Sequence, residues 1–399
     1  MKIIGIGAAG NKAVWTAAVY KAIQMEDILL MNSTTKDFPK EATDKCALIS
    51  NTGGCGKERT IGKEIMTRFL TNPDKVNQFA KNFIGDNETH VVIVTSMAGG
   101  TGSGAANILG KFCKYELDCD VTIIAFRGFN EDIREISNTI EFLKELDKEF
   151  TVQIICNEHF MEESNGNKIE AEKKANINLA MRLSTMRGNR LVDSDQNIDS
   201  TDMYKIVTMP GYQQIEYSEI KGVKNHEQMN KVIKDMIDTS CGLATIPSRD
   251  CIIGIMLNIK KDTLNWFDFQ YQYFKKMYGN TNELFIHIQY IEDSGDNDEW
   301  IRVIVSGLKL PIEELENLKL QYEQETQNSN DREDAFFSVA KSLNLNDNSS
   351  FNRGARRRRV KESYDGTGFL NSLNKEESDS KSNGVFTQTN EEKLGKSSF

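Results

Sequence analysis

Short apolar runs alternate with amphipathic stretches through the first half of the chain. Each run holds four to six residues and is apolar on both faces, which is typical of central parallel strands covered by helices on both sides. Helical spacing lies between several runs, as at 104–115 and 132–147. The pattern predicts an α/β fold with a Rossmann-like, doubly wound parallel sheet. The runs are residues 3–6, 28–31, 91–94, 121–126 and 152–156.

The second half follows a different pattern, which begins with a long helix predicted over 169–186. Its apolar residues Ala175, Leu179, Leu183 and Met186 recur at spacings of three and four. A smaller α+β domain is predicted beyond this helix. Its strands are expected at 251–259, 284–290 and 300–308, and a helix at 262–277.

These patterns divide the chain into five predicted parts. Pro311 opens a charged helix, and the sequence after it is rich in Ser, Asn, Asp, Glu and Lys, which predicts a mostly disordered tail. The parts are an α/β domain (1–168), a central helix with its connection (169–200), an α+β domain (201–310), a C-terminal helix (311–327) and the tail (328–399).

Composition narrows the class of protein. The chain has 49 Lys and Arg against 59 Asp and Glu, a net charge of −10, which argues against nucleic acid covering the whole surface. No window approaches eighteen consecutive apolar residues, so no membrane-spanning helix is expected. The chain starts with a strand-like run rather than a signal peptide, and we expect a cytoplasmic protein.

The cysteines and histidines predict no metal site. The seven cysteines include no CxxC pair, and the four histidines form no HxxxH or HExxH pattern. Reduced and mostly buried thiols are therefore expected. We expect no zinc site built from protein ligands.

A first glycine cluster, GIGAAG at 5–10, follows the first strand and opens a helix. This GxGxxG pattern lets backbone amides approach a diphosphate at a helix N-terminus. A dinucleotide-binding protein would also carry an acidic residue at the end of the second strand, where Asn32 stands instead. The cluster alone leaves open a Rossmann-type NAD-dependent oxidoreductase and a tight packing turn.

A second cluster, MAGGTGSGAA at 97–106, follows the strand that begins at 91. Its four glycines and two hydroxyls cannot fill a core, but they can present successive N–H groups to an anion. It is not a Walker A loop, because GxxxxGK[ST] occurs nowhere in the chain. Two such loops at strand ends of one sheet converge on one crevice, which favours a nucleotide site over a structural role.

The second cluster resembles the GGGTGSG signature of the tubulin and FtsZ superfamily of GTPases, with Ala98 in place of the first glycine. The resemblance extends over about residues 1–310 through further motifs in the expected order. It implies the tubulin/FtsZ fold, GTP or GDP as ligand with Mg²⁺, and a set of nucleotide-binding residues. These are Gly7, Ala8, Gly10, Asn11, Asn32, Gly53, Gly54, Gly56, Ala98, Gly99, Gly100, Thr101, Gly102, Ser103, Glu131, Arg134 and Asn176.

The resemblance also implies roles within that set. The loop at 53–56 resembles the family's loop over the γ-phosphate, and Glu131 and Arg134 resemble residues that reach the ribose and base. Asn176 stands where the family places a side chain on the guanine edge, with Asn178 as the alternative if the register differs. No metal cluster is implied, because Mg²⁺ on a nucleotide keeps mostly water and phosphate ligands.

The segment NIDSTD at 197–202 resembles the FtsZ-type NxDxxD loop at the end of the long helix. In that family the loop enters the nucleotide site of the next subunit. The resemblance therefore implies that Asn197, Asp199 and Asp202 are catalytic and that GTP hydrolysis is coupled to head-to-tail polymerisation into filaments. Read alone, two Asp three residues apart are also typical of the N-cap and first turn of a helix.

A basic run lies in the predicted tail. A basic tail beyond a C-terminal helix resembles the TubZ branch, the plasmid and phage segregation tubulins, which implies a DNA-bound adaptor of the TubR type as partner. Direct DNA contact and a passive solvated tail stay open, as do a phage spindle tubulin, a divergent division protein and a scaffold without turnover. The six cations are Arg353, Arg356, Arg357, Arg358, Arg359 and Lys361.

Overall fold

The computed structural model describes most of the chain up to residue 327. The predicted helix at 262–277 and the predicted tail lie outside the described residues. By its contacts the chain divides into Met1–Asn328 and Ser329–Phe399, and every described residue belongs to the first unit. The described residues are 1–50, 53–129, 132–188, 197–220, 222–223, 225–238, 240, 242, 251–260, 283–291, 298–310, 316–324 and 326–327.

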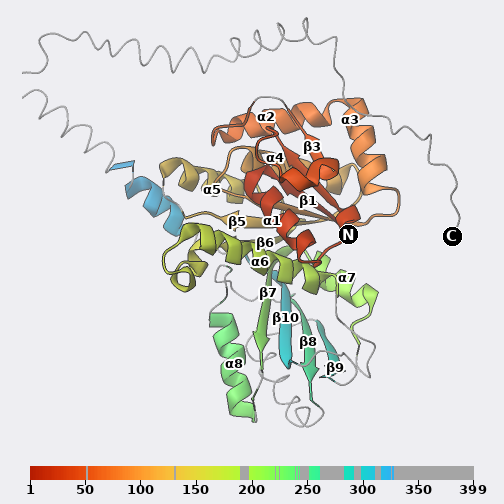
Figure 1. Cartoon of the computed structure of the whole chain (residues 1–399), viewed down its shortest axis with the longest axis vertical. Coiled ribbons are helices and arrows are strands. Elements are labelled where there is room, and N and C mark those ends of the chain that lie inside the picture. Colours follow the sequence, from red (N-terminus) through yellow and green to blue (C-terminus); the bar gives the residue numbers. More distant parts are fainter. Residues whose placement is uncertain are drawn as a thin grey trace, which may run out of the picture. The chain divides into compact units, whose positions relative to one another are not determined.

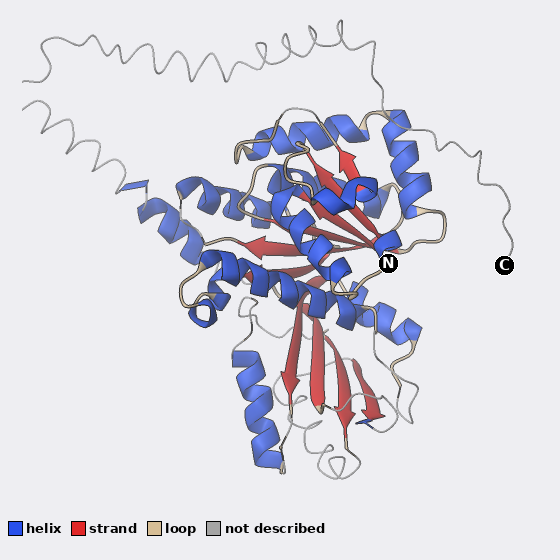
Figure 2. Cartoon of the chain, in the orientation of Figure 1, coloured by secondary structure: helices blue, strands red, loops and turns tan. Residues whose placement is uncertain are grey.

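Six parallel strands form the first part of one sheet (Figures 1 and 2). They are β1 Lys2–Ile6, β2 Ile28–Asn32, β3 Cys46–Leu48, β4 His90–Ser96, β5 Asp120–Arg127 and β6 Thr151–Cys156. Their order is β3-β2-β1-β4-β5-β6, so the chain winds outward from β1 in both directions. This reversal between β1 and β4 is the topological switch point of a doubly wound sheet, which confirms the predicted fold class.

Alternate residues of these strands pack into two separate cores. In β4, Val91 and Ile93 belong to one cluster, while Val92 and Val94 belong to the other. Residues of a strand point alternately to the two faces, so a strand buried on both sides is apolar throughout. The first core is covered by α2 Arg59–Leu70, α4 Thr101–Tyr115 and α5 Ile133–Glu145, and the second by α1 Gly7–Val19 and α6 Lys168–Met186.

Four further strands continue the same sheet in the order β7-β10-β8-β9. They are β7 Gly211–Glu219, β8 Ile252–Ile259, β9 Glu283–Tyr290 and β10 Trp300–Leu308. β7 joins the first part through a short parallel pairing with β6, at Thr151 with Gly211 and Val152 with Tyr212. β10 is antiparallel to both β7 and β8, whereas β8 and β9 are parallel. The strands expected in the second half are confirmed, and β3 and β7 are additional.

The remaining described helices lie around this sheet. Residues 316–324 form part of the predicted C-terminal helix, and Leu318 packs against Ile136 and Ile140 of α5. None of the described helices is both long and apolar enough to cross a bilayer. The other elements are α3 Pro73–Gln78, α7 Ser200–Thr208, α8 His226–Asp238, a π-helix at Phe79–Ile84 and short 3₁₀ segments at Met25–Asp27, Lys40–Lys45, Asn157–Phe160 and Glu162–Ser164.

Helices α2 and α4 approach each other through glycines. A Cβ atom added at Gly62 would lie 2.4 Å from the carbonyl oxygen of Gly100. One added at Gly104 would lie 2.3 Å from the carbonyl oxygen of Arg59. Neither distance is compatible with a side chain, so the pairing of these helices requires both glycines.

We expect Gly62→Ala to lower the free energy of unfolding by about 1–3 kcal/mol, because the methyl group must displace backbone atoms. Urea unfolding followed by circular dichroism measures the change. Thr67→Ala, at an exposed position of the same helix, is the control and should leave the midpoint unchanged. Equal midpoints for both variants would refute the close packing.

Candidate functional site

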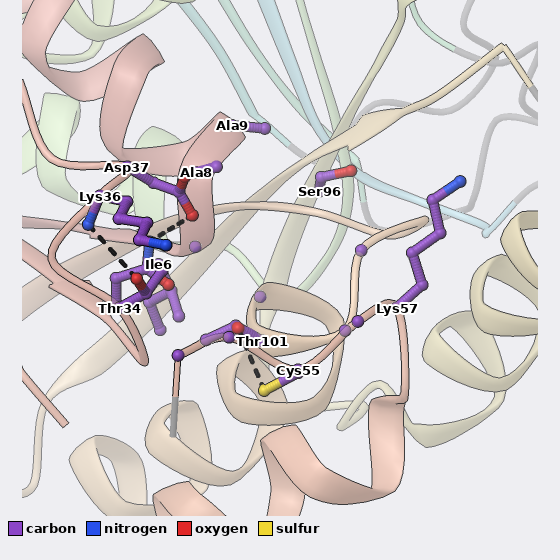
Figure 3. A pocket seen from close by; sticks show the side chains of 18 residues that line it. Ile6, Ala8, Ala9, Thr34, Lys36, Asp37, Cys55, Lys57, Ser96 and Thr101 are labelled. Atoms are coloured by element: carbon purple, nitrogen blue, oxygen red, sulfur yellow. Dashed lines mark hydrogen bonds between the residues drawn. The ribbon is translucent and has the colours of Figure 1, made fainter. Parts of the chain in front are cut away.

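A crevice of about 380 Å³ lies at the carboxyl ends of β1, β2 and β4 (Figure 3). Ile6, Asn32 and Ser96, the last residues of these strands, line it. Figure 3 shows Lys36 and Asp37 on one side of the crevice and Lys57 on the other. Open α/β sheets bind ligands at this edge, at the switch point.

Two helices begin at the crevice without side-chain caps. Helix α1 starts at Gly7 and α4 at Thr101, and neither has a capping hydrogen bond from a side chain or an acidic residue in its first turn. Uncapped N–H groups at a helix N-terminus attract anions. The crevice therefore has the chemistry of a phosphate site. By contrast, side chains cap α3, α5, α6 and α7, namely Asn72, Asp132, Asn167 and Asp199.

Most of the residues predicted to bind nucleotide line this crevice. Gly7 has a φ of +76°, which a side chain would strain. A Cβ at Gly102 would lie 2.4 Å from Thr95 Oγ1, so the start of α4 can approach the sheet only as glycine. The predicted residues that line it are Gly7, Ala8, Asn32, Gly53, Gly54, Gly56, Gly99, Gly100, Thr101 and Gly102.

Some of the predicted residues have other contacts. Asn11 is buried and its Nδ2 donates to the carbonyl of Met31 at 3.1 Å. The hydroxyl of Ser103 donates to the carbonyl of Gly99. The predicted residues that do not line the site are Gly10, Asn11, Ser103 and Arg134. Glu131 lies outside the described residues.

A second cavity, of about 490 Å³, adjoins the crevice. Predicted residues Ala98 and Asn176 line it, together with Phe126, Phe129 and Asn157. Both cavities share a common wall, so they form one elongated site. The residues common to both are Ala8, Ala9, Lys57, Ser96 and Gly99.

Two amide side chains in the second cavity have polar atoms available to a ligand. Asn157 Oδ1 is buried and has no hydrogen-bond partner in the described part of the chain. No described residue is hydrogen-bonded to the Asn176 side chain, which is 7% exposed. Together with the ring of Phe129, these amides suit a planar heterocycle with donors and acceptors on its edge.

The loop 53–58 closes one side of the crevice. Its residue Lys57 adopts a φ of +64°, which is uncommon for a residue with a side chain. Lys57 Nζ donates to Asp132 Oδ2 at 2.7 Å and to Glu135 Oε1 at 2.6 Å, and these hydrogen bonds raise the pKa of Lys57. Arg134 donates to the carbonyl of Gly56 at 3.3 Å. The start of α5 thus holds this loop.

A buried group of polar side chains joins three parts of the site. Thr101 Oγ1, at the start of α4, lies 2.8 Å from Ser33 Oγ, which follows β2. Thr101 also donates to Cys55 Sγ at 3.2 Å, a contact drawn in Figure 3. Cys55 is 5% exposed and is a free cysteine, as expected from the sequence. The end of β2, the loop 53–58 and α4 are therefore connected behind the phosphate site.

The predicted catalytic residues lie at the opposite end of the strands, where β4 begins. Asn197 and Asp199 line a third cavity together with His90, the first residue of β4, whereas Ser96 at the other end of β4 lines the crevice. A strand of seven residues spans about 20 Å. The Asp199 loop therefore cannot reach the crevice of its own subunit.

Asp199 is the N-cap of α7. Its Oδ1 accepts a hydrogen bond from the backbone N–H of Asp202 at 2.8 Å. Asp202 stands in the first turn of that helix. The helix-capping interpretation of these two residues is confirmed. Capping does not test the catalytic interpretation, because Asp199 is exposed and its second carboxylate oxygen is not used by the cap.

Several residues that line the two cavities of the site were not predicted from the sequence. Cys55 stands inside the recognised glycine loop 53–56, Lys57 directly follows that loop, and Asn157 directly follows a predicted strand, so position was an available signal for these three. Lys36 and Asp37 gave none, because polar residues after a strand are common in any loop. The missed residues are Ile6, Ala9, Lys12, Thr34, Lys36, Asp37, Cys55, Lys57, Ser96, Phe126, Gly128, Phe129, Glu135, Asn157, Lys168 and Glu172.

Comparison with known proteins agrees with this geometry. Residues 1–165 match the Tubulin/FtsZ family, GTPase domain. The cell division protein FtsZ of Porphyromonas gingivalis is 25% identical over 162 residues, which are 39% of this chain and 34% of that protein. The match thus spans about a third of the curated relative.

Solved structures share the fold over most of the chain. The tail-truncated TubZ of Clostridium botulinum phage c-st has a TM-score of 0.60 at 17% identity, covering 82% of this chain and 97% of that one. A GTPγS-bound protofilament of CetZ2 from Haloferax volcanii has a TM-score of 0.65 at 16% identity, covering 83% and 100%. The fold is that of tubulin and FtsZ. The match of residues 1–165 to that GTPase domain, together with the shared fold, confirms the predicted resemblance.

An ion pair behind the crevice fastens α2 to α5. Arg59, the first residue after the loop 53–58, donates to both oxygens of Glu145 at 2.8 and 2.5 Å, and Lys63 also donates to Glu145. The Arg59 hydrogen bonds, opposed by burial and reinforced by Lys63, hold the pKa of Glu145 at about 2.

We expect Glu145→Gln to lower the free energy of unfolding by about 1–2 kcal/mol at pH 7. This is less than the full pKa shift of Glu145 corresponds to, because the ion pair is partly exposed to solvent. The pair's contribution is complete above the ordinary pKa of 4.5 and is lost as the pH falls towards 2, since the unfolded chain then binds an extra proton. Urea unfolding at pH 7, 4 and 3 should show the difference from wild type narrowing. Glu141→Gln, exposed on the same helix, is the control, and a pH-independent difference would contradict the assignment.

Proposed function

We propose that the protein binds GTP in the elongated site and hydrolyses it between subunits of a head-to-tail polymer. The observation that carries the proposal is the separation, about 20 Å, between the crevice and the Asp199 loop. An exposed acidic loop and a phosphate site at opposite edges of one subunit suit catalysis across a contact. The family match of residues 1–165 supports GTP as the nucleotide.

In this proposal the phosphates lie at the N-termini of α1 and α4, and the base lies in the second cavity. Lys36 supplies positive charge beside the phosphates, whereas the charge of Lys57 is shared with Asp132 and Glu135. Guanine presents N–H donors and a carbonyl acceptor on one edge. Asn157 Oδ1 can accept from it, and the Asn176 amide can both donate and accept.

The residues present also fit a Mg²⁺ ion carried in by the nucleotide. No cluster of three or more His, Cys, Asp or Glu occurs among the described residues, so most ligands of the ion would be phosphate oxygens and water. Asp37 is the acidic residue that lines the phosphate half, and it would supply a carboxylate. The ion would neutralise negative charge on the phosphates.

Hydrolysis is assigned to residues of the neighbouring subunit. Asn197, Asp199 and Asp202 of one subunit would lie over the γ-phosphate of the next, where the carboxylates orient the attacking water and accept its proton. A contact between two different surfaces of identical subunits repeats without closing, which gives a filament. The protofilament form of CetZ2 from H. volcanii, which has the same fold, supports such an assembly.

Turnover should therefore depend on assembly. Phosphate release measured against protein concentration, with light scattering in the same cuvette, should show a critical concentration above which both signals rise. Asp199→Asn should lower turnover at least about 100-fold while polymer persists, because asparagine still caps α7 but removes the charge.

The control is Asp74→Asn, which removes the charge of another exposed acidic residue at the start of a helix, α3, that lines none of the three cavities. It should leave turnover unchanged. Turnover proportional to concentration without scattering, or full activity of Asp199→Asn, would refute catalysis between subunits.

We further propose a role in plasmid or phage DNA segregation, through recruitment of a DNA-bound adaptor by the tail. The six cations within residues 353–361 support an acidic partner, and the shared fold with phage c-st TubZ is consistent with it. These residues lie outside the described part of the chain.

Truncation after Gln327 should abolish recruitment and leave GTP turnover and assembly intact. Cosedimentation measures recruitment. The polymer is sedimented with the adaptor and the DNA site that are encoded beside the gene for this protein. Replacing the six cations with glutamine should give the same loss. Cosedimentation with DNA alone that weakens with salt would instead indicate direct contact.

A further inference from the structure

Helix α5 inserts an amide side chain between the two glycine loops of the crevice. Asn138 is 7% exposed, and its Nδ2 lies within hydrogen-bond distance of three backbone carbonyls. These belong to Lys57 at 2.9 Å, Ala98 at 3.0 Å and Gly99 at 3.4 Å. One side chain thus contacts both the loop 53–58 and the loop 97–100.

The carbonyl contacts fix which way the neighbouring N–H groups point. In a planar trans peptide the C=O and the following N–H lie on opposite sides. When Asn138 holds the carbonyls of Ala98 and Gly99, the N–H groups of Gly99 and Gly100 point away from it. Both glycines line the crevice, and within the described chain neither N–H group has an acceptor.

Close contact between the two loops makes this orientation sensitive to their spacing. A Cβ at Gly100 would lie 2.9 Å from both Cys55 Cβ and the backbone nitrogen of Glu58. Glu58 donates its N–H to the carbonyl of Cys55 at 2.8 Å, which closes the turn that Asn138 holds at Lys57. Neither loop can shift without changing the other.

We propose that Asn138 is a positioning residue that turns the Gly99 and Gly100 N–H groups towards the phosphates of the bound nucleotide. The inference rests on the proposed GTP site, but it concerns the anion-binding half alone. Asn138 itself lines neither cavity, so the proposal gives it no direct contact with the nucleotide. Its effect should therefore appear in phosphate affinity and not in base affinity.

The test compares dissociation constants for GTP, GDP, guanosine and inorganic tripolyphosphate by calorimetry, in the full chain. Asn138→Leu should weaken GTP, GDP and tripolyphosphate by about 10- to 100-fold, as expected for one or two misdirected charge-assisted hydrogen bonds. Guanosine affinity should stay within twofold. Asn138→Ser keeps one donor, so it should show a smaller loss and serves if the leucine variant does not fold.

Asn107 provides a matched control. It is a buried asparagine on α4 whose Nδ2 donates to the carbonyl of Phe142 in α5 at 3.3 Å, away from both loops. Asn107→Leu should lower stability without changing the ratio of GTP to guanosine affinity. Unchanged tripolyphosphate affinity in folded Asn138 variants, or a parallel loss of guanosine affinity, would overturn the proposal.

The outcomes separate the two proposals. If wild type binds tripolyphosphate but not GTP, the proposed function fails, and the Asn138 variants still test positioning with tripolyphosphate. If wild type binds neither, both proposals fail.

Discussion

The site depends on two neighbouring parallel strands, each followed by a helix that begins without a cap. β1 and β4 lie side by side at the switch point, and their helices α1 and α4 pack into opposite cores. Their N-termini therefore converge on one crevice, and the N–H groups of both remain for a ligand. Leaving such donors unpaired lowers stability unless water or an anion binds them, so the arrangement favours function over stability.

Much of the fold could be predicted because the central strands are buried on both faces and are apolar throughout. β7 could not, since Gln213, Gln214 and Glu216 give it a polar sequence although all three are buried. Gln213 Nε2 lies 3.0 Å from the carbonyl of Ile206 and 2.7 Å from Ser306 Oγ, and the Gln153 amide donates to its Oε1. Ser306 and Gln153 lie 93 and 60 residues away in the sequence, and periodicity contains no information about such partners.

The same distinction separates the parts of the site. The glycine loops could be recognised from sequence because they act through backbone, and only glycine permits the close approaches at Gly7 and Gly102. Asn138 could not, since asparagine inside an amphipathic helix is usually a solvent-facing residue of low helix propensity. Its acceptors Ala98 and Lys57 lie 40 and 81 residues away. Residues that act on backbone from another element become visible only in three dimensions.

Asp199 shows why two interpretations of one motif need not compete. An N-cap uses one carboxylate oxygen, here Oδ1 on the N–H of Asp202, and leaves the other directed to solvent. The cap also fixes the backbone of the loop relative to α7, whose Ile206 and Val207 are buried in the core. A carboxylate held in this way is exposed but not freely rotating. The proposed catalysis between subunits requires this property of Asp199, because the carboxylate would have to enter the neighbouring site with a defined geometry, and helix capping already orders it.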